Sequence, residues 1–233
     1  MDHPALSVII PVYREELRIN ALLAHVASLP ALGGVEVLVV DGDPEQRTLA
    51  VLDLDMAIPV ASDKGRARQM NAGAAVAQGD MLLFLHADTR LPVDAFQLIH
   101  SALAGQTFCG GAFSLSIQPE VGLPRSGLRF IAWAANLRSR VTRAPYGDQA
   151  IFIRRDCFVP LGGFSDIPLM EDLEFMTRLR RRGLPIAILR ARVVTSARRW
   201  EKEGLLHCTG RNLLLRALYH LGVPAHRLVG FYP

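Results

Sequence analysis

The chain has 233 residues, of which 50% are hydrophobic and 21% are charged. This composition is that of a globular protein and excludes a disordered one, and the length suits one large domain with a substantial core. The formal net charge is +4, and nearly all the positive charge is arginine, because Lys64 and Lys202 are the only lysines. Arginine grips phosphate in a bidentate manner, but genomic composition explains the bias equally well.

Other features disfavour whole classes of protein. No apolar run approaches the ~20 residues that cross a bilayer, and no cationic segment precedes an apolar stretch, so we expect neither a transmembrane segment nor a signal peptide. Aromatic residues are few and are not interleaved along a strand face, which argues against nucleic-acid binding. Cys109, Cys157 and Cys208 are odd in number and lack a metal-type spacing, so we expect a cytoplasmic protein.

Strands and helices alternate over the first 90 residues. The expected strands span residues 6–12, 35–40, 58–61 and 81–85, and the expected helices between them span residues 15–29, 46–52 and 64–78. The strands are continuous apolar runs, which is typical of strands buried on both faces of a parallel sheet. The alternation predicts an α/β fold with a doubly wound, mostly parallel sheet and helices on both faces.

After Pro92 the regular alternation ends. We expect helices at residues 93–103, 123–141, 171–182 and 205–221, and strands at residues 110–117, 150–153, 186–189 and 193–196. The segment 123–141 has a basic amphipathic pattern. Because no internal repeat or low-complexity linker interrupts the chain, we expect a single domain over residues 1–233.

Two of the predicted strands are followed by carboxylates. The run 37–40 leads into Asp41 and Asp43, and the run 81–85 leads into His86, Ala87 and Asp88. Ligands of open α/β sheets bind beyond the carboxyl ends of the strands, so these side chains suggest a site for hydroxyl groups, a divalent metal or both. The alternative is structural, because Asp is common in turns and at caps.

The third predicted helix begins with a basic segment. Backbone donors at a helix N-terminus together with Arg66 or Arg68 suit a diphosphate, and Asn71 lies one turn further on. Residues two apart on a helix do not point the same way, so we expect only one of the two arginines to reach a ligand. The alternative is a solvated basic face.

A second acidic pair, Glu171 and Asp172, begins the helix that ends in arginines 180–182. Acid at the start and base at the end complement the helix dipole, which is a sufficient structural reason for these charges. However, the preceding segment 161–170 is apolar and glycine-rich, as expected where a substrate approaches the backbone. Polar residues 146–149 before a buried strand also suggest a pocket.

Six segments, in their order along the chain, resemble motifs of the family 2 glycosyltransferases, which have the GT-A fold. They are residues 7–15, 39–43, 84–89, 147–155, 162–164 and 170–174. Each is weak alone, but six in order are specific, and the likeness extends from residue 7 to about residue 200. The pattern is most similar to a small, soluble bacterial branch associated with arsenosugar or other specialised-metabolite biosynthesis.

The resemblance implies a nucleoside-diphosphate sugar donor, linked to UDP or GDP, and a divalent cation, Mn²⁺ or Mg²⁺. It implies that Asp88 binds the metal and that Asp172, in the Glu171–Asp172 pair, is the general base. His86 replaces the first Asp of the usual Asp-x-Asp motif, so we expect His86 to assist in metal or ribose binding. Together with Arg68 and Asn71 of the third predicted helix, the residues predicted to bind the nucleotide sugar are Pro11, Tyr13, Glu15, Asp41, Asp43, Arg68, Asn71, His86, Ala87, Asp88, Arg199 and Trp200.

The assignment of Arg199 and Trp200 rests on the segment 196–200, which is similar to the Gln-x-x-Arg-Trp motif of processive members, with Ser196 in place of Gln. Arg199 would meet the leaving diphosphate and Trp200 would stack on a sugar. Because the Gln and the membrane helices are missing, we do not expect a processive polymerase. We expect residues 1–92 to bind the donor, and residues 93–233 to bind a small-molecule or lipid acceptor and to end in a helical region.

The predicted reaction is an inverting transfer to an acceptor hydroxyl. A sugar nucleotidyltransferase is a poor alternative, because residues 11–14 do not form its glycine-rich loop. A lipid or polyprenyl-phosphate glycosyltransferase at the membrane surface is a nearer alternative, since a basic amphipathic helix at 123–141 suits anionic lipid. A core-packed helix with a solvated basic face is favoured over it. A degenerate member that only binds nucleotide is the third alternative.

Overall fold

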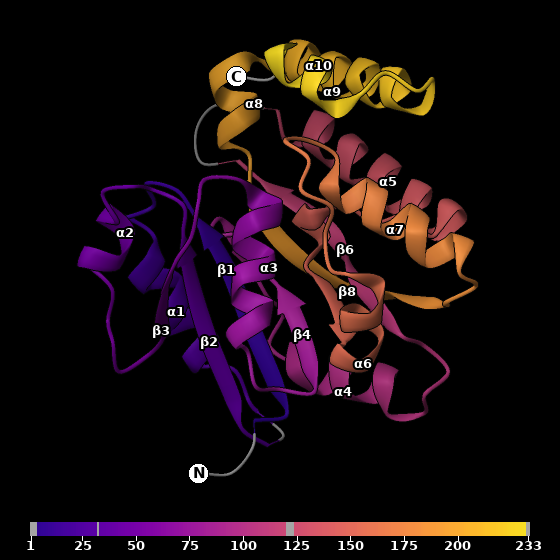
Figure 1. Ribbon diagram of the computed structural model, residues 1–233. Helices are drawn as coiled ribbons and strands as arrows, with labels where there is room; N and C mark the ends of the chain where they lie inside the picture. The colour runs from indigo at the N-terminus through magenta and orange to yellow at the C-terminus, as the bar shows by residue number, and fades with distance from the viewer. Residues whose placement is uncertain (1–3, 32, 120–123, 232–233) are drawn as a thin grey trace.

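The computed structural model describes residues 4–31, 33–119 and 124–231. Within them, one sheet has the strand order β3-β2-β1-β4-β7-β6-β8-β5, and helices cover both of its faces (Figure 1). The strands are β1 (Leu6–Val12), β2 (Val35–Asp41), β3 (Ile58–Ala61), β4 (Met81–Phe84), β5 (Thr89–Arg90), β6 (Gly110–Gln118), β7 (Ile151–Arg154) and β8 (Ile186–Ser196). The predicted α/β fold with a mostly parallel sheet is confirmed.

The helices divide between the two faces. They are α1 (Ile19–Ala27), α2 (Arg47–Ala50), α3 (Arg66–Val76), α4 (Ala95–Ala104), α5 (Arg125–Thr142), α6 (Arg155–Phe158), α7 (Glu171–Arg181), α8 (Arg198–Glu203), α9 (Leu205–His220) and α10 (Ala225–Leu228). One apolar core joins α1, α4 and α5 to the sheet, and the other joins α3, α6 and α7 to its opposite face. Helices α8 to α10 lie at one end of the molecule, beyond the start of α5 (Figure 1).

Strands β1 to β4 bring the predicted carboxylates to one edge. These strands are parallel, with Pro11 paired to Val40 and Val12 paired to Asp41. Val8, Ile10, Val39 and their neighbours are inaccessible to solvent on both faces of the sheet, as their continuous apolar runs predict. The segments that follow β1, β2 and β4 therefore lie side by side at the carboxyl ends of the strands.

The second half of the sheet departs from the sequence prediction. Strand β7 runs antiparallel to β4 and β6, whereas β6 and β8 are parallel. The predicted strands 186–189 and 193–196 are one strand, β8, and the register between β6 and β8 shifts between Ala112 and Ser114. A local irregularity of this kind breaks the alternation that marks a continuous strand. Strand β5 has only two residues, which is too short for a sequence signal.

The start of the first helix also differs from the prediction. Helix α1 begins at Ile19 rather than at residue 15, because Arg14 has a positive φ of 58° and the Glu15 N–H donates to Thr48 Oγ1. The start predicted for the basic amphipathic helix at residue 123 lies outside the described residues. Its described part, α5, packs Leu128 and Ala132 into the core. Among the described helices, none has the length and hydropathy that crossing a bilayer requires.

Candidate active site

A cavity of about 540 Å³ lies between α5, α9, the start of α7 and the segments that follow β4 and β8. Its volume is that of a small-molecule site. Apart from Arg66, His86 and Asp88, the residues of its wall all follow residue 92. The titratable and charged part of the wall consists of Arg66, His86, Asp88, Arg138, Tyr146, Asp148, Glu171, Asp172, Arg198, Arg199 and Arg216.

Asp172 is held in this wall by two backbone donors. The N–H of Gly147 donates to Asp172 Oδ2 at 2.7 Å, and the N–H of Leu173 donates to Oδ1 at 2.7 Å. A Cβ atom on Gly147 would lie 2.8 Å from His86 Nε2 and 3.6 Å from Asp172 Oδ2. His86 and Asp172 therefore pack against the same glycine, which brings the segment after β4 and the start of α7 together.

The two other carboxyl groups near Asp172, those of Asp148 and Glu171, have raised pKa values. Burial raises the pKa of Asp148 to about 6, and the negative charge of Asp172 adds to the rise. Burial also raises the pKa of Glu171, while Arg66, whose Nη1 lies 3.3 Å from Glu171 Oε1, opposes the rise. Glu171 is only 3% exposed, and its carboxylate forms an ion pair with Arg66 in the wall of the cavity.

The segment after β4 carries a carboxylate and a neutral imidazole. Asp88 Oδ2 lies 3.3 Å from Arg198 Nε, and Arg198 also pairs with Glu15 at 2.5 Å. Burial lowers the pKa of His86 to about 3, and its Nε2 atom is buried without a hydrogen-bond partner among the described residues. A neutral imidazole nitrogen without a partner beside a carboxylate is a donor set that Mn²⁺ accepts.

No group of three or more His, Cys, Asp or Glu side chains within the described residues is arranged to hold a metal ion. A cation that bridges phosphates needs only one or two protein ligands, since phosphate oxygens and water complete its shell. His86 and Asp88 therefore fit a cation that arrives with a diphosphate, and they do not fit a metal held by protein alone.

The edge predicted to bind the donor is formed by the ends of β1 and β2 and the residues that follow them, and these residues do not line the cavity. Both oxygens of Asp41 accept backbone N–H groups: Oδ1 from Asp43 at 2.9 Å, and Oδ2 from Thr48 at 3.1 Å and Leu49 at 3.4 Å. Asp41 is completely buried. It therefore fixes the turn after β2 and the start of α2, which is the structural alternative that the sequence left open.

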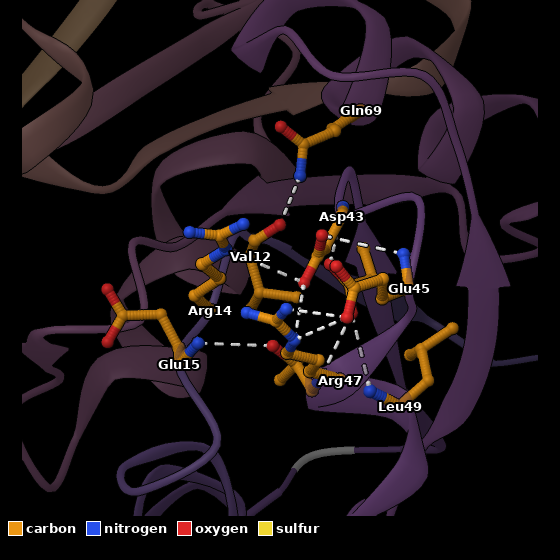
Figure 2. Close-up of polar contacts among 10 residues, drawn as sticks. Val12, Arg14, Glu15, Asp43, Glu45, Arg47, Leu49 and Gln69 are labelled. Atoms are coloured by element: carbon orange, nitrogen blue, oxygen red, sulfur yellow. Dashed lines mark hydrogen bonds and ion pairs between the residues drawn. The ribbon is translucent and has the colours of Figure 1, made fainter.

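Asp43 has a different environment. Its Oδ2 atom is buried and has no hydrogen-bond partner, and the Nε atoms of Arg14 and Arg47 each lie 3.8 Å from it (Figure 2). Gln69 of α3 supports this edge, because its Nε2 donates to Val12 O at 2.6 Å and to Val40 O at 2.9 Å. An unsatisfied buried carboxylate oxygen is a candidate acceptor for a ligand hydroxyl or imino group.

The other predicted donor residues are distributed around this edge. Pro11 lies in β1, and the half-buried ring of Tyr13 follows it with the Lys64 ammonium 4.5 Å from its centroid. Ala87 is buried between His86 and Asp88. Glu15 is bound by Arg198, whose two terminal nitrogens donate to its carboxylate.

Two predicted residues of α3 contact the protein rather than the cavity. Arg68 Nε donates to Asp166 Oδ1 at 2.9 Å at the exposed surface. Of the two arginines at the start of α3, it is Arg66 that lines the cavity. The Asn71 amide donates to Phe164 O at 2.8 Å and accepts the Phe164 N–H at 2.9 Å. Asn71 thus joins α3 to the glycine-rich segment before α7.

A sequence model of the family described as glycosyl transferase family 2 matches residues 7–142, more than half of the chain. The chain belongs to this family. No curated protein matches it by sequence. The prediction of a family 2 glycosyltransferase with the GT-A fold is confirmed, and the resemblance to the arsenosugar branch stays a prediction.

Solved structures share the fold of this glycosyltransferase. TarS 1–349 of S. aureus has a TM-score of 0.60 at 15% identity, over 97% of this chain and 68% of its own. TarS in complex with UDP-GlcNAc has a TM-score of 0.60 at 17% identity, over 82% of this chain and 58% of its own. The mannosyltransferase PcManGT of Pyrobaculum calidifontis, in complex with GDP-Man and Mn²⁺, has a TM-score of 0.68 at 23% identity, over 94% of this chain and 62% of its own. The chain thus spans about 60% of the length of two of these three chains.

The end of β8 completes the cavity of the glycosyltransferase. Arg199 and Trp200 line it, and Trp200 Nε1 donates to Thr209 Oγ1 at 3.2 Å, which ties α8 to α9. Thr195 Oγ1 donates to Asp88 Oδ1 at 3.4 Å across the β5–β8 pair. The segment 196–200 therefore lies beside the metal-binding candidates, although it is more than 100 residues away in the chain.

Sequence reasoning left several cavity residues out of the predicted site. Asp148 belongs to the polar segment 146–149, which suggests a pocket, but the sequence does not distinguish Asp148 from its neighbours there. Arg138 stacks 3.4 Å from the Tyr146 ring centroid, and Arg216 Nη1 donates to Tyr146 Oη at 3.1 Å. Arg138 follows the cavity residues Ala134 and Ala135 of α5 by four and three positions, so it lies on the same face of the helix. The sequence alone does not show which face of α5 lines the cavity.

Proposed function

We propose that this glycosyltransferase transfers a sugar from a nucleoside-diphosphate donor to an acceptor hydroxyl in one displacement, with inversion at the anomeric carbon. The observation that carries the proposal is Asp172, fixed by the N–H groups of Gly147 and Leu173 in the cavity that His86 and Asp88 also line. The complexes of TarS with UDP-GlcNAc and of PcManGT with GDP-Man and Mn²⁺ support a nucleotide-sugar donor.

The donor binds with its nucleoside at the ends of β1 and β2. Asp43, with its unsatisfied Oδ2, accepts a hydroxyl or imino group of the nucleoside, and Tyr13 offers an aromatic face beside it. The diphosphate then extends toward the segment after β4. The nucleotide is UDP or GDP, and in this placement the contacts to its nucleoside come from residues 1–92 of the single domain.

Asp88 and His86 would hold Mn²⁺ or Mg²⁺ next to the diphosphate, and when bound the cation neutralises charge that develops on the leaving phosphate oxygens. The chain supplies further positive charge in the same wall through Arg66 and Arg199. Arg198 neutralises part of the negative charge of Asp88 and Glu15, since its guanidinium contacts both carboxylates. The indole of Trp200 offers a stacking surface for a sugar ring.

Asp172 is the base. It accepts the proton of the acceptor hydroxyl as that oxygen bonds to the anomeric carbon, while the diphosphate leaves from the opposite side with the C–O bonding electrons. General-base catalysis contributes about 10²–10⁴-fold. Positioning and stabilisation of the leaving group supply most of the remainder. Glu171 supports the site through its ion pair with Arg66.

The test is a pair of isosteric variants. Asp172→Asn keeps the acceptor of the Leu173 or Gly147 N–H but cannot take a proton, so we expect kcat to fall by ~10² or more with nucleotide affinity nearly unchanged. Glu171→Gln is the matched control and should cost less. If Asp172→Asn transfers sugar at the wild-type rate, Asp172 is not the base, and if the wild type itself transfers none to any acceptor while it binds nucleotide, the degenerate alternative holds.

A further inference from the structure

The cavity continues away from the carboxylates as a groove between two helices. On α5 its wall consists of residues spaced 3, 4, 7, 8 and 11 positions from Gly127, which is one face of a helix. On α9 the residues lie 1, 4, 7, 8 and 11 positions after Leu205. We call this the α5–α9 groove, and it is defined by Gly127, Phe130, Ile131, Ala134, Ala135 and Arg138 with Leu205, Leu206, Thr209, Asn212, Leu213 and Arg216.

The α5 side of the groove is apolar until its last residue, Arg138. A Cβ atom on Gly127 would lie 2.6 Å from Leu205 Cδ2, so the two helices touch at that point. Two turns further along α5, Ala134 and Ala135 are small, and the space that larger side chains would fill belongs to the cavity. The groove is therefore built to receive an apolar group.

The mouth of the groove exposes large apolar side chains. Leu206 is 86% exposed and Phe130 is 66% exposed, although both line the groove. The rings of Phe130 and Trp133 stack with centroids 5.7 Å apart, and Trp133 is 58% exposed. A group of exposed large apolar side chains at the mouth of a cavity marks an interaction site rather than ordinary surface.

Basic residues flank the same rim. Arg125 and Arg129 are exposed on the first turns of α5, next to Phe130. The sequence left open whether this helix packs on the core with a solvated basic face or faces lipid. In the structure Leu128 and Ala132 are buried, and the exposed surface of the same helix combines arginine with aromatic rings. That combination is typical of an amphipathic helix at an anionic lipid surface.

We propose that the α5–α9 groove binds the alkyl or prenyl chain of a lipid acceptor presented by a membrane surface. The groove and the base are parts of one cavity, since Asp172 lines it, so a chain in the groove leaves a hydroxyl at its head beside Asp172. The exposed arginines meet anionic headgroups while the aromatic rim enters the lipid. This inference rests on the proposed function for the identity of the base.

The binding test uses the two tryptophans of the chain. Trp133→Phe leaves Trp200, which lines the cavity, as the only indole. We would titrate this variant with 1-dodecanoylglycerol below its micelle-forming concentration and with 1-butanoylglycerol, and follow the Trp200 fluorescence. Each methylene that enters the groove should tighten binding about fourfold until the groove is full. We expect at least 100-fold tighter binding of the longer chain, and equal affinities would overturn the proposal.

Three variants in the Trp133→Phe background locate the binding site. Ala134→Phe fills the groove and should weaken dodecanoylglycerol binding at least 10-fold. Leu206→Gln, at an exposed position that tolerates a polar residue, should weaken it several-fold without affecting folding. Val141→Phe is the matched control, because Val141 is 74% exposed on the same helix and does not line the cavity. Wild-type affinity in both groove variants would refute the assignment.

Sedimentation with vesicles tests the source of the chain. We expect salt-sensitive binding to phosphatidylglycerol vesicles and weaker binding to phosphatidylcholine vesicles, with binding reduced by Arg129→Gln. Binding of dodecanoylglycerol without binding to either vesicle would overturn the membrane source in favour of a free apolar acceptor. A dimer that excludes dodecanoylglycerol would overturn it in favour of a second copy of the chain.

A thermal-shift measurement with UDP or GDP and Mn²⁺ separates this inference from the proposed function. The groove variants should keep the wild-type nucleotide shift. If no nucleotide stabilises the wild type, the proposed function fails, whatever the lipid result.

Discussion

Asp41 and Asp43 are two residues apart, but the structure predicts opposite consequences when each is changed to Asn. Asp41 is completely buried and accepts three backbone N–H groups, two at Oδ2 and one at Oδ1. An Asn side chain has only one acceptor oxygen. In its better orientation it leaves the Asp43 N–H facing an amide N–H₂, and in the other it leaves two N–H groups unpaired.

The magnitude follows from these contacts. One buried N–H without a partner costs ~1–3 kcal/mol, and the two remaining hydrogen bonds lose their charge assistance. Asp41→Asn should therefore destabilise the fold by about 2–4 kcal/mol. For a chain of this size each kcal/mol lowers Tm by about 2–4 °C, so we expect a fall of about 4–16 °C. Asp43→Asn should cost less than about 1 kcal/mol, because its arginine partners are 3.8 Å away and largely exposed.

The assay measures both quantities on both variants. Tm is recorded without ligand, and the Kd of UDP and of GDP is measured by calorimetry with Mn²⁺. We expect Asp41→Asn to lower Tm and to keep nucleotide affinity at temperatures well below its Tm. Asp43→Asn should keep Tm and weaken nucleotide binding at least 10-fold. The reverse result, a stable Asp41→Asn protein that binds no nucleotide, would refute the division between structural and binding carboxylates.

Three further predictions concern the cavity. Asp88→Ala should abolish the Mn²⁺-dependent part of nucleotide affinity in a calorimetric titration, and His86→Ala should weaken it less; unchanged affinity in Asp88→Ala would place the metal elsewhere. Gly147→Ala should lower kcat at least 10-fold with little change in Tm, since its Cβ would displace His86 Nε2, and wild-type kinetics would contradict that packing. Asp148 has a pKa of about 6 when folded, above the 3.8 of an ordinary Asp, so the folded state binds more protons between these values and loses stability as pH rises from about 4 to 6. The Tm of Asp148→Asn minus that of the wild type should therefore increase over this range and then level off, and a flat difference would show that Asp148 is not perturbed.

The sequence predicted the first half of the sheet well because each signal there is local. A continuous apolar run closed by turn residues identifies a buried strand, and the end of such a strand locates Asp41 and Asp88. The direction of β7 was not predictable, because hydrophobic periodicity is the same for parallel and antiparallel strands. The two-residue strand β5 has no periodicity at all.

The residues of the site were harder to assign when a distant partner decides their role. Helical phase indicated that only one of Arg66 and Arg68 faces a ligand, but the choice depends on Asp166, which holds Arg68 almost 100 residues away. Likewise, Asp41 and Asp43 look equivalent in the sequence. The N–H groups of α2 that occupy Asp41 come from residues 48 and 49, whose position depends on how the chain turns after β2.

The acidic pair at the start of α7 illustrates how a structural and a catalytic account are separated. The helix dipole favours a negative charge at both Glu171 and Asp172, so the dipole alone cannot distinguish them. Their partners do: Glu171 is buried against Arg66, whereas Asp172 receives the N–H of Gly147, a residue of the segment that also packs against His86. The Arg66 guanidinium contacts the Glu171 carboxylate at Oε1, so that oxygen is already engaged within the protein. The Asp172 carboxylate is oriented by two backbone N–H groups in the wall of the cavity, and a fixed carboxylate facing the space where a substrate binds is what general-base catalysis requires.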